Sequence, residues 1–181
     1  MDIYLMDVMT RDAELLYDSG FHDGDCAWED TSIVFTRESQ IWIMDQDGTN
    51  ARQVTDYALA GHQGAATLPF GDYDPRLRPG ENLICFDRMV DDQVTSGNYD
   101  FFTITPAGTG ETQITFTEYS QFIAEWSRAG DELVFIVAAV DGAGRFDIYT
   151  MNADGSDMHP ISVNNVNEFD PCVLPDGRVL F

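Results

Sequence analysis

A nine-residue phrase that recurs along this chain restricts its fold more than any other feature. Residues 147–155, DIYTMNADG, rewrite residues 40–48, QIWIMDQDG, and shorter copies stand at residues 100–104 and 2–7. A second phrase accompanies it, in which a turn sequence leads into an apolar run; its copies are residues 25–35, 74–86, 124–135 and 170–181. Self-similarity at a fixed period indicates a repeat architecture, so the chain is predicted to be built from repeated structural units.

The length of the repeat and its internal pattern predict the type of unit. Phe35, Phe86, Phe135 and Phe181 mark equivalent positions, at intervals of 51, 49 and 46 residues. Each unit carries four short apolar runs, rich in the β-branched and aromatic residues that favour strands. A β-sandwich with evenly spaced strands is the competing interpretation, but the strands of a sandwich rarely repeat the same sequence motif. We therefore predict an all-β fold, a β-propeller of four-stranded antiparallel blades.

These phrases resemble the WD-repeat-like blades of the TolB β-propeller family. That family's blades read roughly Pro-x-Trp-Ser-Pro-Asp-Gly, then an apolar strand, then Asp-Ile-Tyr-x-Met-Asp-x-Asp-Gly. Residues 124–127 keep the Trp-Ser pair, and residues 171–177 keep both prolines and the Asp-Gly. The resemblance covers nearly the whole chain and implies a propeller that is exported to the periplasm or beyond. It implies little about activity, because such blades serve secretion partners, peptidase entrances and cytochrome-associated subunits.

Aligning the repeats divides the chain, as a single propeller domain or fragment (1–181), into three complete blades and two half-blades. The predicted segments are the half-blade 1–17, the blades 23–55, 72–115 and 121–162, and the half-blade 168–181. Two arrangements fit this division. Either the two half-blades combine into one composite blade and close a four-bladed ring, or the chain is part of a larger propeller. An open half-blade exposes a strand edge that can pair with another chain, so the partners expected are a protein or additional blades from another chain.

The charge balance excludes some classes of partner. The chain has 9 basic residues, all arginines, and 32 acidic residues, giving a formal net charge of −23. This charge speaks against binding nucleic acid, whose phosphates need a basic surface, and against docking on an anionic membrane. The acidic composition is either a halophilic-like adaptation or a surface for cations and basic partners.

Acidic residues recur where the innermost strand of each predicted blade begins. One position holds Asp25, Asp74, Ile123 and Asp170, and the position two residues earlier holds Asp23, Asp72, Gln121 and Glu168. Because innermost strands line a propeller's channel, the six acids are candidates for a carboxylate ring at one rim: Asp23, Asp25, Asp72, Asp74, Glu168 and Asp170. Such a ring would bind a hard cation such as Ca²⁺, or a basic side chain of a partner. The competing interpretation is structural, because an aspartate before a strand commonly hydrogen-bonds to the adjacent turn.

The sequence offers no catalytic constellation. His22, His62 and His159 lack metal-ligand spacing, and neither a nucleophile elbow nor a phosphate-binding loop is present. The odd number of cysteines leaves at least one of the three unpaired. Cys85 lies in an apolar run and is predicted to be core, whereas Cys26 and Cys172 occupy neighbouring positions of innermost strands. No catalytic residue and no certain cofactor is therefore expected.

Three functions follow from these observations. The leading hypothesis is a non-catalytic interaction or scaffold propeller that holds a cation or basic partner at the acidic rim. The second is an accessory propeller of a larger exported enzyme, such as a peptidase or a haem-containing oxidoreductase. The third is a small-ligand or sugar-binding propeller, in which Trp28, Trp42 and Trp126 stack on the ligand; their equivalent positions also suit packing within the blades.

Overall fold

The computed structural model describes residues 2–56, 71–80, 82–89, 99–138, 145–162 and 166–181, and every regular element in these ranges is a strand. The predicted all-β fold is confirmed. The first four-stranded sheet contains β3 (Asp23–Glu29), β4 (Ser32–Arg37), β5 (Gln40–Asp45) and β6 (Arg52–Gln53). The second contains β7 (Asp72–Leu77), β8 (Ile84–Met89), β9 (Tyr99–Ile104) and β10 (Thr112–Gln113). The third contains β11 (Gln121–Trp126), β12 (Glu132–Ala138), β13 (Phe146–Asn152) and β14 (His159–Pro160).

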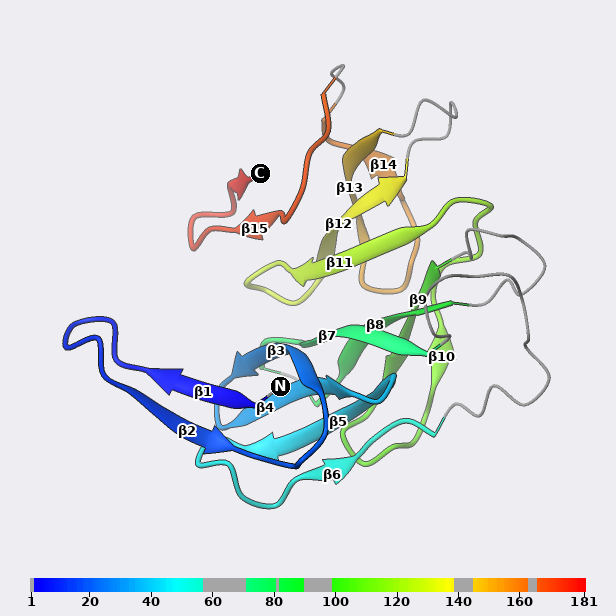
Figure 1. The fold of residues 1–181 in the computed structure, drawn as a ribbon. Coiled ribbons are helices and arrows are strands. Elements are labelled where there is room, and N and C mark those ends of the chain that lie inside the picture. Colours follow the sequence, from blue (N-terminus) through cyan, green and yellow to red (C-terminus); the bar gives the residue numbers. More distant parts are fainter. Residues whose placement is uncertain (1, 57–70, 81, 90–98, 139–144, 163–165) are drawn as a thin grey trace.

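The three four-stranded sheets are successive propeller blades. Within each blade the strands follow the chain order and pair antiparallel. The first strands of the blades, β3, β7 and β11, lie next to one another (Figure 1), as inner strands do around a propeller axis.

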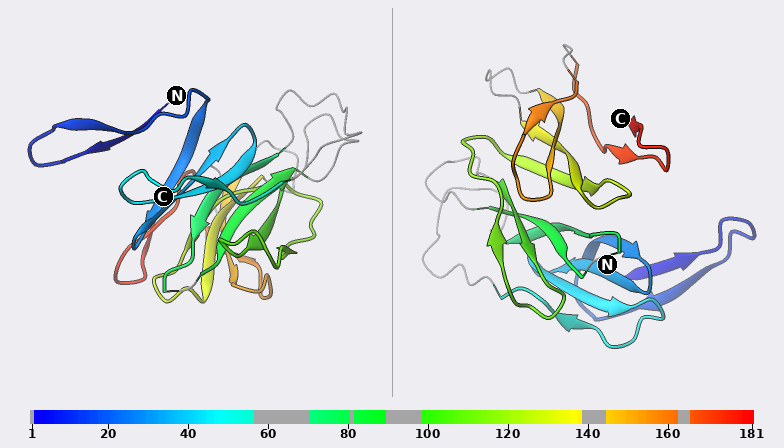
Figure 2. Two further views of the ribbon diagram at one scale, coloured as in Figure 1. Left: turned by 90° about the horizontal axis from the view of Figure 1, so that it is seen from below. Right: turned by 180° about the vertical axis from the view of Figure 1, so that it is seen from behind.

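Two hairpins flank the blades and do not join each other. The first consists of β1 (Ile3–Met6) and β2 (Ala13–Tyr17), and the second of β15 (Cys172–Val173) and β16 (Val179–Leu180). Each hairpin is a separate two-stranded sheet, and Figure 2 shows β1–β2 projecting away from the three blades. The composite fourth blade, one of the two predicted arrangements, is therefore not formed here.

The core consists of the apolar residues between neighbouring blades. Phe35, Phe86 and Phe135 occupy equivalent positions in the second strands, and all three are fully buried. Phe135 meets Phe101 of the preceding blade edge to face, with ring centroids 5.1 Å apart. The repeated phenylalanine thus packs each blade onto its neighbour, which explains why it recurs at blade intervals.

The Asp-Gly hairpin of the repeated phrase has a second role, because its glycine touches the preceding blade. Gly155 has a φ of +85°, and a Cβ added there would lie 1.9 Å from the carbonyl oxygen of Ile114. Gly177 has the same φ of +85°, but an added Cβ would meet no atom within 4 Å. Substitutions at these two glycines therefore distinguish the effect of backbone strain from the effect of crowding between blades.

We expect Gly155→Ala to destabilise the protein by about 3 kcal/mol or more, since it adds a backbone clash to the cost of a positive φ. Gly177→Ala should cost only about 1 kcal/mol, because it adds the positive-φ strain alone. Urea unfolding of the two variants beside the parent protein measures the difference. Equal losses of stability would contradict the close contact between Gly155 and Ile114.

Candidate functional site

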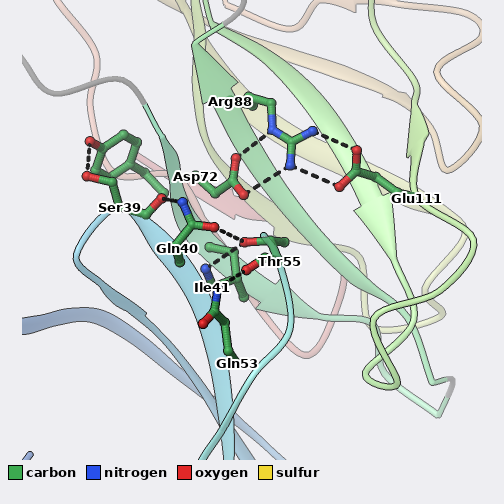
Figure 3. Close-up of polar contacts among 9 residues, drawn as sticks. Ser39, Gln40, Ile41, Gln53, Thr55, Asp72, Arg88 and Glu111 are labelled. Carbon is green, nitrogen blue, oxygen red and sulfur yellow. Dashed lines mark hydrogen bonds and ion pairs between the residues drawn. The ribbon is translucent and has the colours of Figure 1, made fainter. Parts of the chain in front are cut away.

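The earlier of the two acidic positions is occupied by structural carboxylates. Asp72 is fully buried, and its two carboxylate oxygens accept hydrogen bonds from Arg88 at 2.6 and 3.0 Å. The other side of the same guanidinium donates to Glu111 at 2.7 and 2.9 Å. Figure 3 shows Arg88 held between the two carboxylates, with Thr55 of the preceding blade nearby. Burial raises the pKa of Asp72, while Arg88 and then Thr55 act to lower it.

The equivalent residues of the other blades are also engaged. Asp23 is buried and accepts hydrogen bonds from Arg37 at 2.6 Å and from Ser19 at 2.6 Å. Glu168 is buried and accepts a hydrogen bond from Ser162. Asp23, Asp72 and Glu168 therefore all accept hydrogen bonds from protein donors.

In the third blade both residues of this ion pair are replaced. Gln121 replaces the aspartate and pairs across the sheet with Val137, whereas Asp72 pairs with Arg88 and Asp23 with Arg37. Gln121 is fully buried and its side-chain amide donates to Thr117. The paired change shows how the fold tolerates a blade without a charge at this position.

The later acidic position lies at a bulge in each inner strand. Asp25, Asp74 and Ile123 have φ values of 49°, 48° and 53°, and the strand register shifts at each of them. Asp170 has a φ of 49°. Aspartate tolerates this left-handed region better than most residues, whereas a β-branched isoleucine does not. Backbone conformation thus provides a further structural reason for the aspartate repetition, besides hydrogen bonding to the adjacent turn.

The three aspartates at this position interact electrostatically with one another or with a fourth acid, Asp87, which the repeat did not reveal. Asp87 lies in the middle of β8 and is only 1% exposed, and its Oδ1 has no hydrogen-bond partner among the described residues. Its carboxyl group lies within hydrogen-bonding reach of Asp74, and Asp25 and Asp170 act electrostatically on this pair. We call Asp25, Asp74, Asp87 and Asp170 the acidic cluster. Asp87 and Arg88 together interrupt the apolar residues of β8, and that interruption was the signal for Asp87 in the sequence.

Burial and mutual repulsion favour protonated carboxyls at Asp74 and Asp87. Burial, followed by the charge of Asp25, raises the pKa of Asp74 to about 6. Burial raises the pKa of Asp87 well above its ordinary value, and the charges of Asp74 and Asp25 raise it further. Arg76 opposes the shift at Asp74, but its guanidinium donates to Glu125 of the third blade at 2.7 Å. The cluster therefore contains more carboxyl groups than Arg76, the cation beside it, can neutralise.

A cavity lies further along the inner strands. It has a volume of about 310 Å³ and its lining comes from all three blades, including Trp28, Arg76, Glu125 and Trp126. A second cavity of about 300 Å³ shares Glu29, Pro79 and Trp126 with it. The Arg76–Glu125 ion pair thus stands between the acidic cluster and an aromatic-lined hollow.

The three tryptophans differ in exposure despite their repeated positions. Trp126 is buried, donates its indole N–H to the Arg76 carbonyl at 3.2 Å and lies under the Arg78 guanidinium. Trp42 packs against Arg37, whose guanidinium carbon lies 4.2 Å from the centroid of the Trp42 ring. Trp28 is 50% exposed beside the cavity. Of the three, Trp28 alone offers an open ring face for a ligand.

The remaining candidates are dispersed. Cys85 is buried, with a pKa raised by burial, as predicted for a core thiol; Cys26 and Cys172 are exposed, and all three are free. His22 and His159 are exposed, whereas His62 and the polar loop 91–98 lie outside the described residues. Among the described residues, no group of three or more His, Cys, Asp or Glu side chains is placed to hold a metal ion. The predicted Ca²⁺ ligation by the rim acids stays a prediction.

Comparison with known proteins identifies the fold. No protein-family model matches the chain. TolB from Acinetobacter baumannii superposes with a TM-score of 0.69 at 16% identity, over 98% of this chain and 42% of TolB. The chain has the TolB-type β-propeller fold. A Mycobacterium tuberculosis puromycin-hydrolyzing peptidase gives a TM-score of 0.67 at 13% identity, over 98% and 30% of the two chains.

A chain of the nidogen/laminin complex also superposes, with a TM-score of 0.61 at 14% identity, over 87% of this chain and 54% of that one. The chain therefore spans about half, or less, of the length of these three propeller proteins. The similarity confirms the predicted propeller of TolB type. Within the described residues, no helix is long and apolar enough to cross a membrane.

Proposed function

We propose that this chain is a non-catalytic protein-interaction propeller that receives a basic segment of a protein partner at the acidic cluster. The observation that carries this proposal is the excess of carboxyl groups at one end of the inner strands. Asp25 and Asp170 are exposed and Asp74 is partly exposed, while Arg76, whose charge acts on Asp74, is bonded to Glu125. A lysine or arginine of the partner would supply the positive charge that these carboxylates lack.

The charge of the whole chain supports the same class of partner. A formal net charge of −23 attracts a basic protein over long range and repels an acidic one. Because exposed charges are screened by salt, binding of this kind weakens as ionic strength rises. The nidogen/laminin complex shows that a propeller of this shape can occur in a protein complex. The expected location stays periplasmic or extracellular, as the TolB resemblance implies.

The proposal predicts that a short lysine- and arginine-containing peptide binds the protein, and that Asp25→Asn with Asp170→Asn weakens this binding at least fivefold. Asparagine keeps the side-chain shape and tolerates the positive φ of both positions, so the fold should be retained. Isothermal titration calorimetry at low and moderate salt measures the effect. The same peptide with glutamines in place of its basic residues should not bind.

A matched control separates the cluster from bulk charge. Asp47 and Asp154 are exposed aspartates of hairpin turns, each accepting hydrogen bonds within its own turn. Asp47→Asn with Asp154→Asn removes the same two charges and should change the affinity less than about twofold. Equal weakening by the two double variants would show that net charge alone attracts the peptide, and would contradict a site at the cluster.

A second candidate function is an accessory propeller of a larger exported enzyme. It is favoured by the peptidase comparison, in which the match covers 30% of the peptidase chain. Under this hypothesis the cavity beside Trp28 faces the entry path of a substrate. The intact mass of the protein from its native source tests it: a mass near 20.2 kDa would contradict an attached catalytic domain.

A further inference from the structure

The two hairpins that flank the blades correspond to the two halves of one blade. In each complete blade the second strand pairs with the third, and an aromatic pair recurs in this pairing: Phe35–Trp42, Phe86–Phe102 and Phe135–Tyr149. In the repeat, β15–β16 corresponds to the first and second strands, and β1–β2 to the third and fourth. Among the described residues, β16 pairs only with β15 and β1 pairs only with β2. Each hairpin therefore has an open edge where the other half of a blade belongs.

Side chains on these two open edges are exposed at positions that the complete blades bury. Phe181 is 55% exposed, although the phenylalanines at the same repeat position of the three complete blades are fully buried. Met6 is 58% exposed, whereas Met44 and Met151 at the same repeat position are 1% exposed. The exposed apolar surface is thus the surface that a complete blade covers with its own strands.

Both hairpins already lie in the place of a further blade. Ile3 is buried against the first blade, and Tyr17 meets Phe35 there with ring centroids 5.8 Å apart. Val173 and Val179 pack against the apolar side chains of the third blade. From its base on the first blade, β1–β2 projects away from the three blades (Figure 2). The hairpin therefore continues an interface between blades and extends to where a second molecule can reach it.

We propose that the β1–β2 hairpin of one copy of this chain pairs with the β15–β16 hairpin of a second copy, so that the two form a composite four-stranded blade. Strand addition of this kind uses the open main-chain groups of both edges. Mutual exchange of the two hairpins joins two copies into a closed assembly. The inference goes beyond the proposed function, because it does not involve the acidic cluster.

The complete blades set the register of this pairing. Phe135 lies opposite Tyr149, so Phe181 of one copy is expected opposite Tyr4 of the other. Antiparallel pairing in this register gives three further pairs: Leu180–Leu5, Val179–Met6 and Arg178–Asp7. The pair of Val179 with Met6 has the same character as its counterparts in the complete blades, which are Ile33–Met44, Ile84–Ile104 and Leu133–Met151.

The charges in this register are complementary. Arg178 is one of only nine basic residues in the chain, and it is placed opposite Asp7. Opposite charges that face each other across two strands stabilise their pairing, whereas like charges destabilise it. A register shifted by one residue would place Arg178 opposite an apolar side chain and turn every side chain of the hairpin to the other face.

The net charge predicts how salt affects the association. Two copies with a formal net charge of −23 each repel one another, and salt screens this repulsion. The association of two copies should therefore strengthen as ionic strength rises. Binding of a basic peptide at the acidic cluster should weaken under the same change, so the two kinds of binding are distinguishable.

Sedimentation of the 181-residue chain tests the association. We expect species of at least twice the 20.2 kDa of one chain, with a dissociation constant that falls as salt is added. Met6→Asp should raise this constant at least tenfold, because it buries a charge opposite Val179. Val8→Asp adds the same charge at an 82% exposed position outside the four pairs, and it should change the constant less than about twofold. A monomer at every concentration and salt, or equal effects of the two substitutions, would overturn the inference.

Cross-linking distinguishes pairing between copies from closure within one copy. Leu5→Cys and Leu180→Cys are made in separate chains that also carry Cys26→Ser and Cys172→Ser, which remove the exposed thiols. Residues directly opposite in antiparallel strands have Cα atoms within reach of a disulfide. Mild oxidation of the mixture should therefore link one chain of each kind. Leu15→Cys, which lies on β2 away from the open edge, should not link to Leu180→Cys.

Two results of the cross-linking would contradict pairing with a second copy. One is a link that forms within a single chain carrying both cysteines and not between the mixed chains, because the hairpins would then close a ring in one molecule. The other is an assembly that forms without the mixed link, since its contact would lie elsewhere. Neither result bears on peptide binding at the acidic cluster, so the proposed function stands or fails by its own experiment.

Discussion

Replacing Arg88 with valine is expected to lower the free energy of unfolding by about 3 to 5 kcal/mol, the usual cost of leaving a buried charge without its partner. Asp72 is fully buried and both of its oxygens accept from Arg88, so the substitution strands a carboxylate in the protein interior. Glu111 contributes less, because its side chain is 39% exposed and can be hydrated. Chemical denaturation of Arg88→Val beside the parent protein measures the loss.

The third blade provides the compensating change for this experiment. Gln121 and Val137 occupy the positions of Asp72 and Arg88 there, so Asp72→Gln combined with Arg88→Val copies an arrangement that the fold already contains. We expect the double variant to regain about half of the lost stability, because its buried side chain is neutral. Full recovery is not expected, since Arg88 also lies over the Phe102 ring, 4.6 Å from its centroid. A double variant as unstable as Arg88→Val alone would contradict the role of the stranded charge.

The second large effect concerns two tryptophans at one repeat position. Trp126→Ala should cost about 3 to 5 kcal/mol, since it empties a buried site and removes the indole hydrogen bond to the Arg76 carbonyl. Trp28→Ala should cost less than about 1 kcal/mol, because half of that side chain is exposed. Thermal unfolding of the two variants compares them directly. Similar losses would mean that Trp28 contributes to packing as much as its position in the repeat suggests.

The repeated phrases were sufficient to predict the architecture. Because every blade must bury the same faces, the same apolar positions recur, and Phe35, Phe86 and Phe135 all prove to be fully buried. The Asp-Gly pairs recur in the repeated phrases as well, and their glycines Gly48, Gly155 and Gly177 all adopt a positive φ, which favours glycine. What the repeat did not reveal is why Gly155 is crowded and Gly177 is not. That difference depends on which blade packs against each turn.

The candidate site was only partly predictable. Asp25, Asp74 and Asp170 belong to the acidic cluster, but Asp23 and Asp72, two residues earlier in their strands, bind buried arginines instead. Side chains two residues apart in a regular strand share a face, and the bulge between them breaks that rule. A sequence alignment of the blades therefore placed all six acids on one rim.

The sequence by itself determined the blade, its strand order and its acidic character, because these depend on local periodicity and composition. The tertiary structure alone decided which acids are neutralised and which remain. Asp87 illustrates the reason: in the sequence it is one acid among 32, and its burial beside Asp74 arises only when β7 and β8 pair. The protonation of a carboxyl group depends on its distance from water and from other charges, and those distances are set by packing between strands and blades.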